Sequence, residues 1–92
     1  MTWEIDYKPT FLKELARVPG NIRGEIEQFV FEIIPEVDNP FALHGVEKMK
    51  GYRQFYKIRF GEYRIGFKID KKSHKIEFLR ALHRKDIYRY FP

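Results

Sequence analysis

The stretch FYKIRFGEYRIGFKI, residues 55–69, decides the fold of this 92-residue chain. On both sides of Gly61 and Glu62, side chains alternate with a period of two residues, which is typical of half-buried strands. The pair Gly61-Glu62 is short enough to form a hairpin turn. The stretch therefore predicts two antiparallel strands, at residues 55–60 and 63–69.

Cations lie along one side of this predicted hairpin. Lys57 and Arg59 are two residues apart and point the same way, and a two-residue turn makes Arg64 their cross-strand neighbour. Like charges placed opposite one another are destabilising, so this arrangement favours an anionic ligand. The alternative is that the three side chains splay into solvent.

The rest of the chain supplies two helices and further strands. Alternation, helical spacing and the turn residues Pro19, Gly20 and Pro35 set the bounds. The predictions are a strand at residues 2–7, a helix at 10–18, a second helix capped by Asn21 and ending near Pro35, a loop at 36–45, a polar turn at 70–74, a strand at 75–82 and a helical turn after His83. This is an α+β fold of order β-α-α-β-β-β, with two N-terminal helices packed on one face of a mostly antiparallel sheet.

Length and charge limit the possible functions. Ninety-two residues form one domain, 1–92, and the absence of cysteine excludes a disulfide framework. Residues 1–46 hold four basic and eight acidic side chains, net −4, whereas residues 47–92 hold fourteen and five, net +9. Such asymmetry indicates a polyanion partner, above all nucleic acid; the alternative is a basic face kept for solubility. With no signal peptide and no apolar run long enough to span a membrane, we expect a cytoplasmic protein.

The C-terminal run, residues 83–90, holds the remaining candidates. It supplies a histidine for proton transfer, an arginine for phosphate and two tyrosines for stacking or acid–base work: His83, Arg84, Tyr88 and Tyr90. The alternative is that Ile87, Tyr88 and Phe91 only pack the end of the chain onto the sheet. For Tyr88 taken alone, packing is the expected role.

Other chemistries lack their residues. The three histidines are scattered without ligand spacing, and Ser73, the single serine, has no implied triad partner. The acidic side chains gather in the first half, which disfavours paired-carboxylate and two-metal hydrolysis. We therefore expect no metal and no cofactor. A metal-free route exists for RNA, in which the 2′-hydroxyl attacks the adjacent phosphorus while cations stabilise the phosphorane.

The sequence resembles the RelE/ParE superfamily of bacterial toxins, and is closer to RelE. The matching segments are the opening strand, the helix with Phe11, Leu12 and Leu15, Asn39-Pro40, Met49-Lys50-Gly51, Tyr56 to Arg64, and His83 to Arg89. The resemblance is carried by the Gly-x-Tyr-Arg hairpin together with the later His-Arg-Lys-Asp-x-Tyr.

The resemblance implies a toxin of a type II toxin–antitoxin pair that cleaves mRNA in the ribosomal A site without metal and is neutralised by an acidic or amphipathic antitoxin. Lys57 matches a family lysine near the scissile phosphate, and Arg64 and Arg84 match arginines that hold it. Arg59 departs from the family lysine and gives up a proton poorly. The family tyrosine corresponds to Tyr88 or Tyr90, four or six residues after Arg84, and His83 is a further acid–base candidate.

Two rival functions stay open. A ParE-like protein would bind DNA gyrase and cleave nothing, although the combination of Lys57, Arg64, Arg84 and a tyrosine favours the nuclease. The other rival is an RNA-binding or antitoxin-binding module without catalysis.

Overall fold

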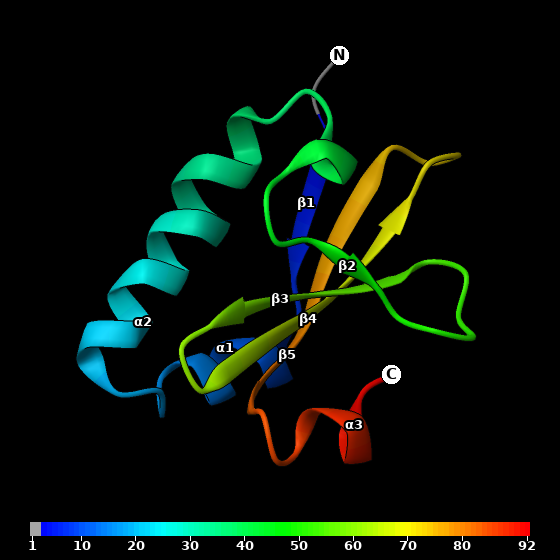
Figure 1. Ribbon diagram of the computed structural model, residues 1–92. Coiled ribbons are helices and arrows are strands. Elements are labelled where there is room, and N and C mark those ends of the chain that lie inside the picture. The colour runs from blue at the N-terminus through cyan, green and yellow to red at the C-terminus, as the bar shows by residue number, and fades with distance from the viewer. Residues whose placement is uncertain (1–2) are drawn as a thin grey trace.

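A five-stranded mixed sheet, in the order β1-β5-β4-β3-β2, forms the centre of the molecule (Figure 1). The computed structural model describes residues 3–92. Its elements are β1 (Glu4–Tyr7), α1 (Pro9–Leu15), α2 (Gly20–Glu27), the π-helix η1 (Gln28–Ile33), the 3-10 turns η2 (Ile34–Glu36) and η3 (Pro40–Ala42), β2 (Glu47–Lys48), β3 (Phe55–Phe60), β4 (Tyr63–Asp70), β5 (Lys75–His83) and α3 (Ile87–Tyr90). The predicted α+β order is confirmed, with β2 as an added edge strand.

The predicted hairpin is confirmed in its register. Strands β3 and β4 are antiparallel, and Arg59 lies opposite Arg64. Gly61 at the turn has a φ of +57°, which glycine adopts without steric cost. Strand β5 continues the meander, and β1 pairs with it in parallel through Tyr7 and Phe78. That single parallel pair makes the sheet mixed.

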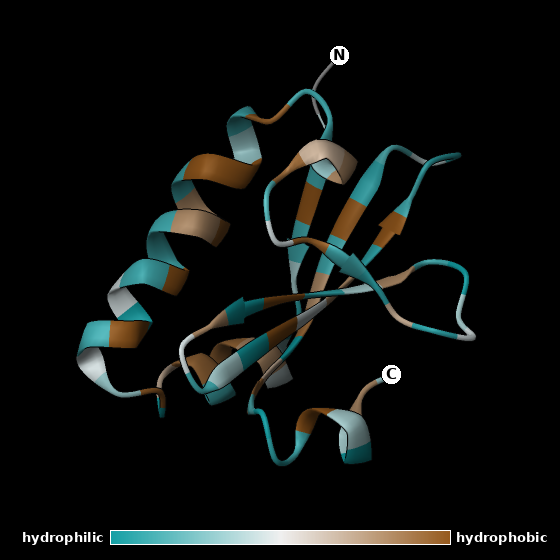
Figure 2. Ribbon diagram, in the orientation of Figure 1, coloured by the Kyte–Doolittle hydropathy of each residue, from teal (hydrophilic) through white to brown (hydrophobic). Residues whose placement is uncertain are grey.

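Apolar side chains between the sheet and the two N-terminal helices make up the core. Strand alternation directs Ile58, Ile65 and Phe67 to the helix-covered face, where each is at most 7% exposed. Phe11 of α1 and Ile26 of α2 are fully buried against that face. Brown, apolar positions recur along α2, η1 and the strands in Figure 2. The predicted packing of the helices on one face is therefore confirmed.

The long second helix departs from its prediction at its N-terminal cap. It begins at Gly20 with Pro19 at the N-cap position and no side-chain cap, so the predicted Asn21 cap is wrong. The Pro19 carbonyl already accepts the first helical hydrogen bond, from the Arg23 N–H at 2.8 Å. The helical segment continues to Glu36, which confirms the predicted end near Pro35, but within it the chain widens into π geometry at η1.

Tyr7 stabilises this wide turn. The Ile34 N–H donates to the Phe29 carbonyl, five residues back, and the next such donor would be Pro35, which has no N–H. The Val30 carbonyl is therefore left without a helical donor, and the Tyr7 hydroxyl donates to it instead. This contact ties η1 to β1.

The first strand and helix are shorter than predicted. Thr2 of the predicted strand lies outside the described residues, and β1 starts at Glu4. The helix ends at Leu15 rather than Val18, because the Arg17 and Val18 N–H groups bond three residues back, in a tightened final turn. Within residues 3–92, no helix is long and apolar enough to cross a bilayer.

Candidate functional site

Three cations share the sheet face that α1 and α2 leave uncovered. Lys57, Arg59 and Arg64 alternate with the core residues of β3 and β4, so their side chains point away from the helices. Arg64 Nη1 donates to the carbonyls of Gly61 and Tyr63 at 2.9 and 3.0 Å. Arg59 Nε donates to the same Gly61 carbonyl at 3.4 Å. The turn carbonyls hold both guanidinium groups, and this lets two like charges lie opposite each other.

Lys57 lies at the centre of a small polar cluster. Its side chain is 15% exposed, and Nζ is 3.0 Å from Glu47 Oε2 and 5.5 Å from the centre of the Tyr88 ring. Partial burial acts to lower the pKa of Lys57, but contacts with Tyr88 and Glu47 outweigh it and raise the pKa above its ordinary value. Lys57 is therefore protonated at neutral pH.

Glu47 was missed by sequence reasoning, which treated residues 36–45 as a loop and found no strand after it. Strand β2 pairs Glu47 directly with Lys57. A two-residue strand has too little alternation to show in the sequence. The one available signal was an isolated acid among the basic residues that precede the hairpin.

Arg84 directly follows the end of β5 and lies at the turn of the β3–β4 hairpin. The backbone N–H of Arg84 donates to the Glu62 carbonyl at 2.7 Å, and the side-chain Nε of Arg84 lies 2.7 Å from Glu62 Oε2. Both side chains are more than half exposed, so this ion pair is weak and open to exchange with another anion. The structure thus brings Arg84 to the turn that also holds Arg59 and Arg64.

Helix α3 lies on the same face of the sheet as the cations. Ile87 and Phe91 are buried against it, in a second small cluster with Met49, and Phe55, Leu79 and Leu82 pack around them. Gly66 makes room for Phe91, since a Cβ at that position would lie 2.7 Å from the ring. The face predicted to be open is therefore half covered by the end of the chain.

Tyr88 and Tyr90 have different surroundings. The expectation that Tyr88 packs against the sheet is wrong, because its side chain is 68% exposed beside Lys57. Tyr90 faces the other way, with its ring 5.8 Å from the Arg80 guanidinium. Positions two apart on a helix point about 200° apart, which separates the two tyrosines.

His83 is not brought to this cluster. The register pairs it with Tyr63, whose ring packs against the core on the helix-covered face, and the two rings meet edge to face at 5.5 Å. Its Nδ1 accepts from the Lys85 N–H at 3.2 Å. His83 therefore lies across the sheet from Lys57 and Arg64.

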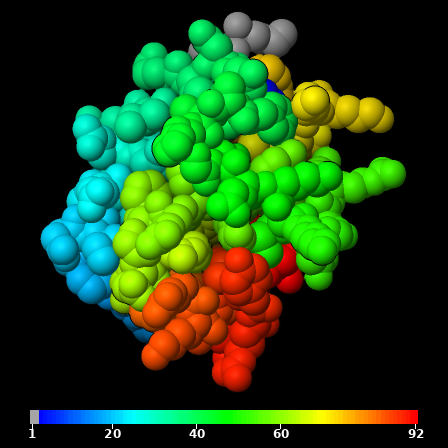
Figure 3. Space-filling model, in the orientation of Figure 1, coloured from blue at the N-terminus to red at the C-terminus, as the bar shows by residue number. Residues whose placement is uncertain are grey.

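A recess of about 350 Å³ opens beside Lys57 and Tyr88. Its lining combines three lysines, one carboxylate and apolar or aromatic side chains: Glu47, Lys48, Met49, Lys50, Tyr52, Lys57, Tyr88 and Phe91. Figure 3 shows the segments that contribute it, green around β2 and red at the C-terminus, meeting on one surface with the orange segment before α3. Within residues 3–92, no three His, Asp or Glu side chains are grouped to hold a metal ion. The arrangement can bind an anion and offers Tyr88 and Lys57 as proton donors.

Comparison with known proteins identifies the family. The family described as ParE toxin of type II toxin–antitoxin systems matches residues 5–88. The chain belongs to this family, within the RelE/ParE superfamily. It is 43% identical over 90 residues to Toxin RelE3 of Methanocaldococcus jannaschii, covering 94% of this chain and 96% of the relative. It is 30% identical over 83 residues to Toxin RelE of Mycobacterium tuberculosis, covering 90% and 82%.

Solved structures agree with the RelE-like assignment. The toxin in the RelB–RelE antitoxin–toxin complex from Methanococcus jannaschii superposes with a TM-score of 0.74 at 41% identity, covering 95% of this chain and 99% of that one. A chain of the RelE–RelB complex from Pyrococcus horikoshii has the same fold, with a TM-score of 0.71 at 23% identity over 91% and 97% of the two chains. The chain is a RelE-like type II toxin, and the resemblance first noted in the hairpin and the C-terminal run is confirmed.

Proposed function

We propose that this toxin is a metal-independent endoribonuclease that cleaves mRNA in the ribosomal A site, in the cytoplasm. The observation that carries the proposal is the meeting of Lys57 and Tyr88 at a recess, on the face that also presents Arg64. A protonated lysine, a fixed guanidinium and a phenol are the groups that phosphodiester cleavage without metal requires.

In the reaction, two protons are transferred, one phosphorus–oxygen bond forms and another breaks. The ribose 2′-oxygen attacks the adjacent phosphorus, the bond from phosphorus to the 5′-oxygen breaks, and a 2′,3′-cyclic phosphate and a 5′-hydroxyl result. Arg64 and Arg84 stabilise the phosphorane charge. Glu47 supplies a carboxylate to the recess and accepts the 2′-hydroxyl proton, Tyr88 donates a proton to the leaving oxygen, and Lys57 contributes its positive charge.

Tyr88 fits the family tyrosine better than Tyr90. Its ring lies 5.5 Å from Lys57 Nζ, whereas the Tyr90 ring lies beside Arg80. His83 is on the helix-covered face and is not assigned to proton transfer here. Arg59 remains a proposed phosphate contact, since its side chain lies next to Arg64.

The test is primer extension on ribosome-bound mRNA, with detection of 2′,3′-cyclic phosphate ends. Wild type should cleave, and Arg84→Ala and Tyr88→Phe should cleave poorly. Lys13→Ala, which removes an exposed cation on α1, is the matched control and should cleave like wild type. Full cleavage by both Arg84→Ala and Tyr88→Phe would overturn the assignment of the site.

The rival function is that of a ParE-like protein that acts on DNA gyrase, and it stays open because the matching family is described as ParE toxin. A supercoiling assay with purified gyrase separates the two functions. Inhibition of supercoiling without RNA cleavage would replace the nuclease by this rival. Binding of RNA with neither effect would leave a module without catalysis.

We also propose an antitoxin as partner, because the similar toxins from Methanococcus jannaschii and Pyrococcus horikoshii were solved as complexes with RelB. The net charge of +9 on residues 47–92 favours an acidic or amphipathic segment bound to that half. Replacing Lys48 and Lys50 together by Glu should weaken binding of a purified cognate antitoxin, whereas Lys13→Glu should not.

A further inference from the structure

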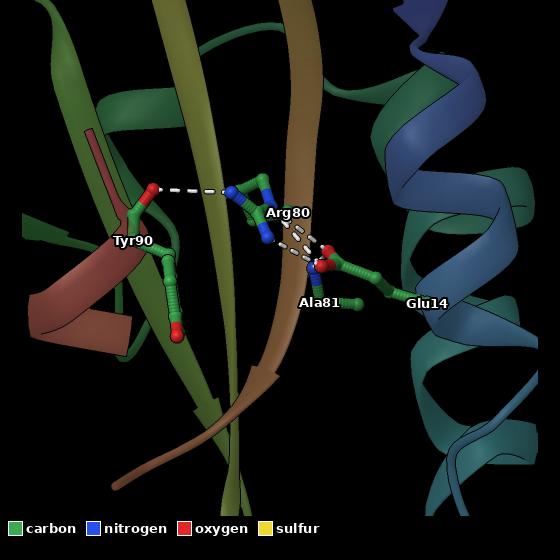
Figure 4. Close-up of polar contacts among 4 residues, drawn as sticks. All are labelled: Glu14, Arg80, Ala81 and Tyr90. Atoms are coloured by element: carbon green, nitrogen blue, oxygen red, sulfur yellow. Dashed lines mark hydrogen bonds and ion pairs between the residues drawn. The ribbon is translucent and has the colours of Figure 1, made fainter. Parts of the chain in front are cut away.

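Arg80 of β5 connects helix α1 to helix α3 (Figure 4). Its Nε donates to both carboxylate oxygens of Glu14, at 3.0 and 3.1 Å, and its Nη2 donates to Oε2 at 2.6 Å. Its Nη1 donates to the Tyr90 carbonyl at 3.1 Å. The side chains of Arg80 and Glu14 are only 26% and 16% exposed. Their two-pronged ion pair is therefore directional and largely removed from water.

Glu14 is itself fixed by the edge of the sheet. Strand β1 pairs with β5 only as far as Phe78, so the N–H of Ala81 has no strand partner on that edge. The Glu14 carboxylate fills this gap, accepting from the Ala81 N–H at 2.9 Å. Glu14 therefore holds the Arg80 guanidinium in place through contacts that do not involve α3.

Helix α3 needs such external support. It comprises four residues, and an isolated helical turn is unstable because few hydrogen bonds offset the fixed backbone. Ile87 and Phe91 anchor it through apolar contacts, which restrain its position less directionally than a hydrogen bond. Arg80 supplies the directional contact and satisfies one of the carbonyls that the last turn of a helix leaves without a donor.

We propose that Arg80, held by Glu14, is a positioning residue that fixes α3 and so sets the place of Tyr88 beside Lys57. Tyr88 and Tyr90 lie in the same helical turn, so the carbonyl that Arg80 holds is two residues from the phenol. The structural part of this inference stands alone. Its catalytic consequence rests on the proposed nuclease function.

The test compares Arg80→Met, which keeps length and packing but removes every donor, with Arg23→Met. Arg23 is the matched control because it also makes a carbonyl contact and an ion pair with a glutamate, but on α2. Amide hydrogen exchange is measured at Phe91, whose N–H bonds the Ile87 carbonyl, and at Ile65 in the sheet. Arg80→Met should exchange at Phe91 about tenfold faster or more, with Ile65 unchanged, because a charge-assisted hydrogen bond is lost.

Cleavage kinetics give a second, separate result. In Arg80→Met, kcat should fall about tenfold or more with KM nearly unchanged, because Tyr88 is misplaced while the cations still bind. Arg80→Lys, which retains a single donor group, should restore part of the loss. Should Arg80→Met fail to fold, Glu14→Gln gives the same comparison, with a smaller increase in exchange at Phe91.

The outcomes separate the two proposals. Unchanged exchange at Phe91 in a folded Arg80→Met protein overturns the positioning role, whatever the activity. Faster exchange with unchanged kcat, where wild type cleaves RNA, supports the Arg80 link to α3 but overturns its role in placing Tyr88 for catalysis. Faster exchange in a protein whose wild type cleaves no RNA supports the Arg80 link to α3 and refutes the nuclease function instead.

Discussion

The two faces of the sheet are made by the same strands but differ in what covers them. On one face Ile58, Ile65 and Phe67 meet two amphipathic helices and are almost fully buried. On the other, Lys57 and Arg64 lie beside a small apolar cluster under α3. The first face carries most of the burial, whereas the second keeps cations where a ligand can reach them.

This difference separates stability from function. Each large side chain buried on the helix-covered face contributes roughly 1.5–3 kcal/mol, so substitutions there should act on folding. The exposed cations contribute little to folding, and opposed Arg59 and Arg64 cost a few tenths of a kcal/mol. Substitutions that change only stability or only activity therefore test this difference between the two faces.

The largest expected effect is on activity. Arg64→Ala should reduce mRNA cleavage by about 100-fold or more, the usual loss when one preorganised donor to a developing charge is removed. The thermal midpoint should change little, because the guanidinium bonds only turn carbonyls. Single-turnover cleavage and thermal unfolding of the same preparation check both expectations. A variant that lost stability in proportion to activity would place Arg64 among the structural residues.

Much of the helix-covered face could be predicted from the sequence, because period-two alternation in residues 55–69 carries both register and face. The hairpin, the meander and the order of the helices followed from this pattern and from Pro and Gly at the turns. The π geometry of η1 could not be predicted, because it depends on Pro35 and on Tyr7, a residue 23 positions before the carbonyl it bonds.

The other face was only partly predictable. Its cations could be predicted, since Lys57, Arg59 and Arg64 alternate with apolar residues. Glu47 could not be, because strand β2 is two residues long, and which of Tyr88 and Tyr90 faces Lys57 depends on how α3 docks. Docking depends on contacts between residues far apart in the sequence, which the local periodicity of apolar residues does not show.

The next expected effect is on the packing of Phe91 against Gly66. Gly66→Ala should destabilise the fold by about 1–3 kcal/mol, because the new Cβ would lie 2.7–2.8 Å from three atoms of the Phe91 ring. Gly24→Ala is the control: it is exposed in α2 with nothing within 4 Å, and should gain up to about 1 kcal/mol from helix propensity. Urea unfolding measures both. Equal stability of the two variants would show that Phe91 does not occupy the space above Gly66.

An effect of similar size should be confined to the helix-covered side. Tyr7→Phe leaves the Val30 carbonyl without its donor and should cost about 1–3 kcal/mol, with RNA cleavage unchanged. Tyr52→Phe, at a half-exposed ring, should leave stability as it is. Urea unfolding and a cleavage assay on both proteins provide the measurement. Loss of cleavage by folded Tyr7→Phe would mean that the two faces are coupled through β1.

The smallest effect concerns the protonation of Lys57. Its pKa is raised in the folded protein, so its contribution to stability is complete below the unfolded value of 10.5 and is lost as pH rises through the higher folded value. Between about pH 6.5 and about pH 9 the ammonium does not titrate. Lys57→Arg, which keeps the charge, should therefore retain the shape of the pH–rate profile, with a rate within about tenfold of wild type. An alkaline decline that wild type shows below pH 9 and Lys57→Arg lacks would mean that Lys57 loses its proton in this range, and that Glu47 and Tyr88 do not hold it charged.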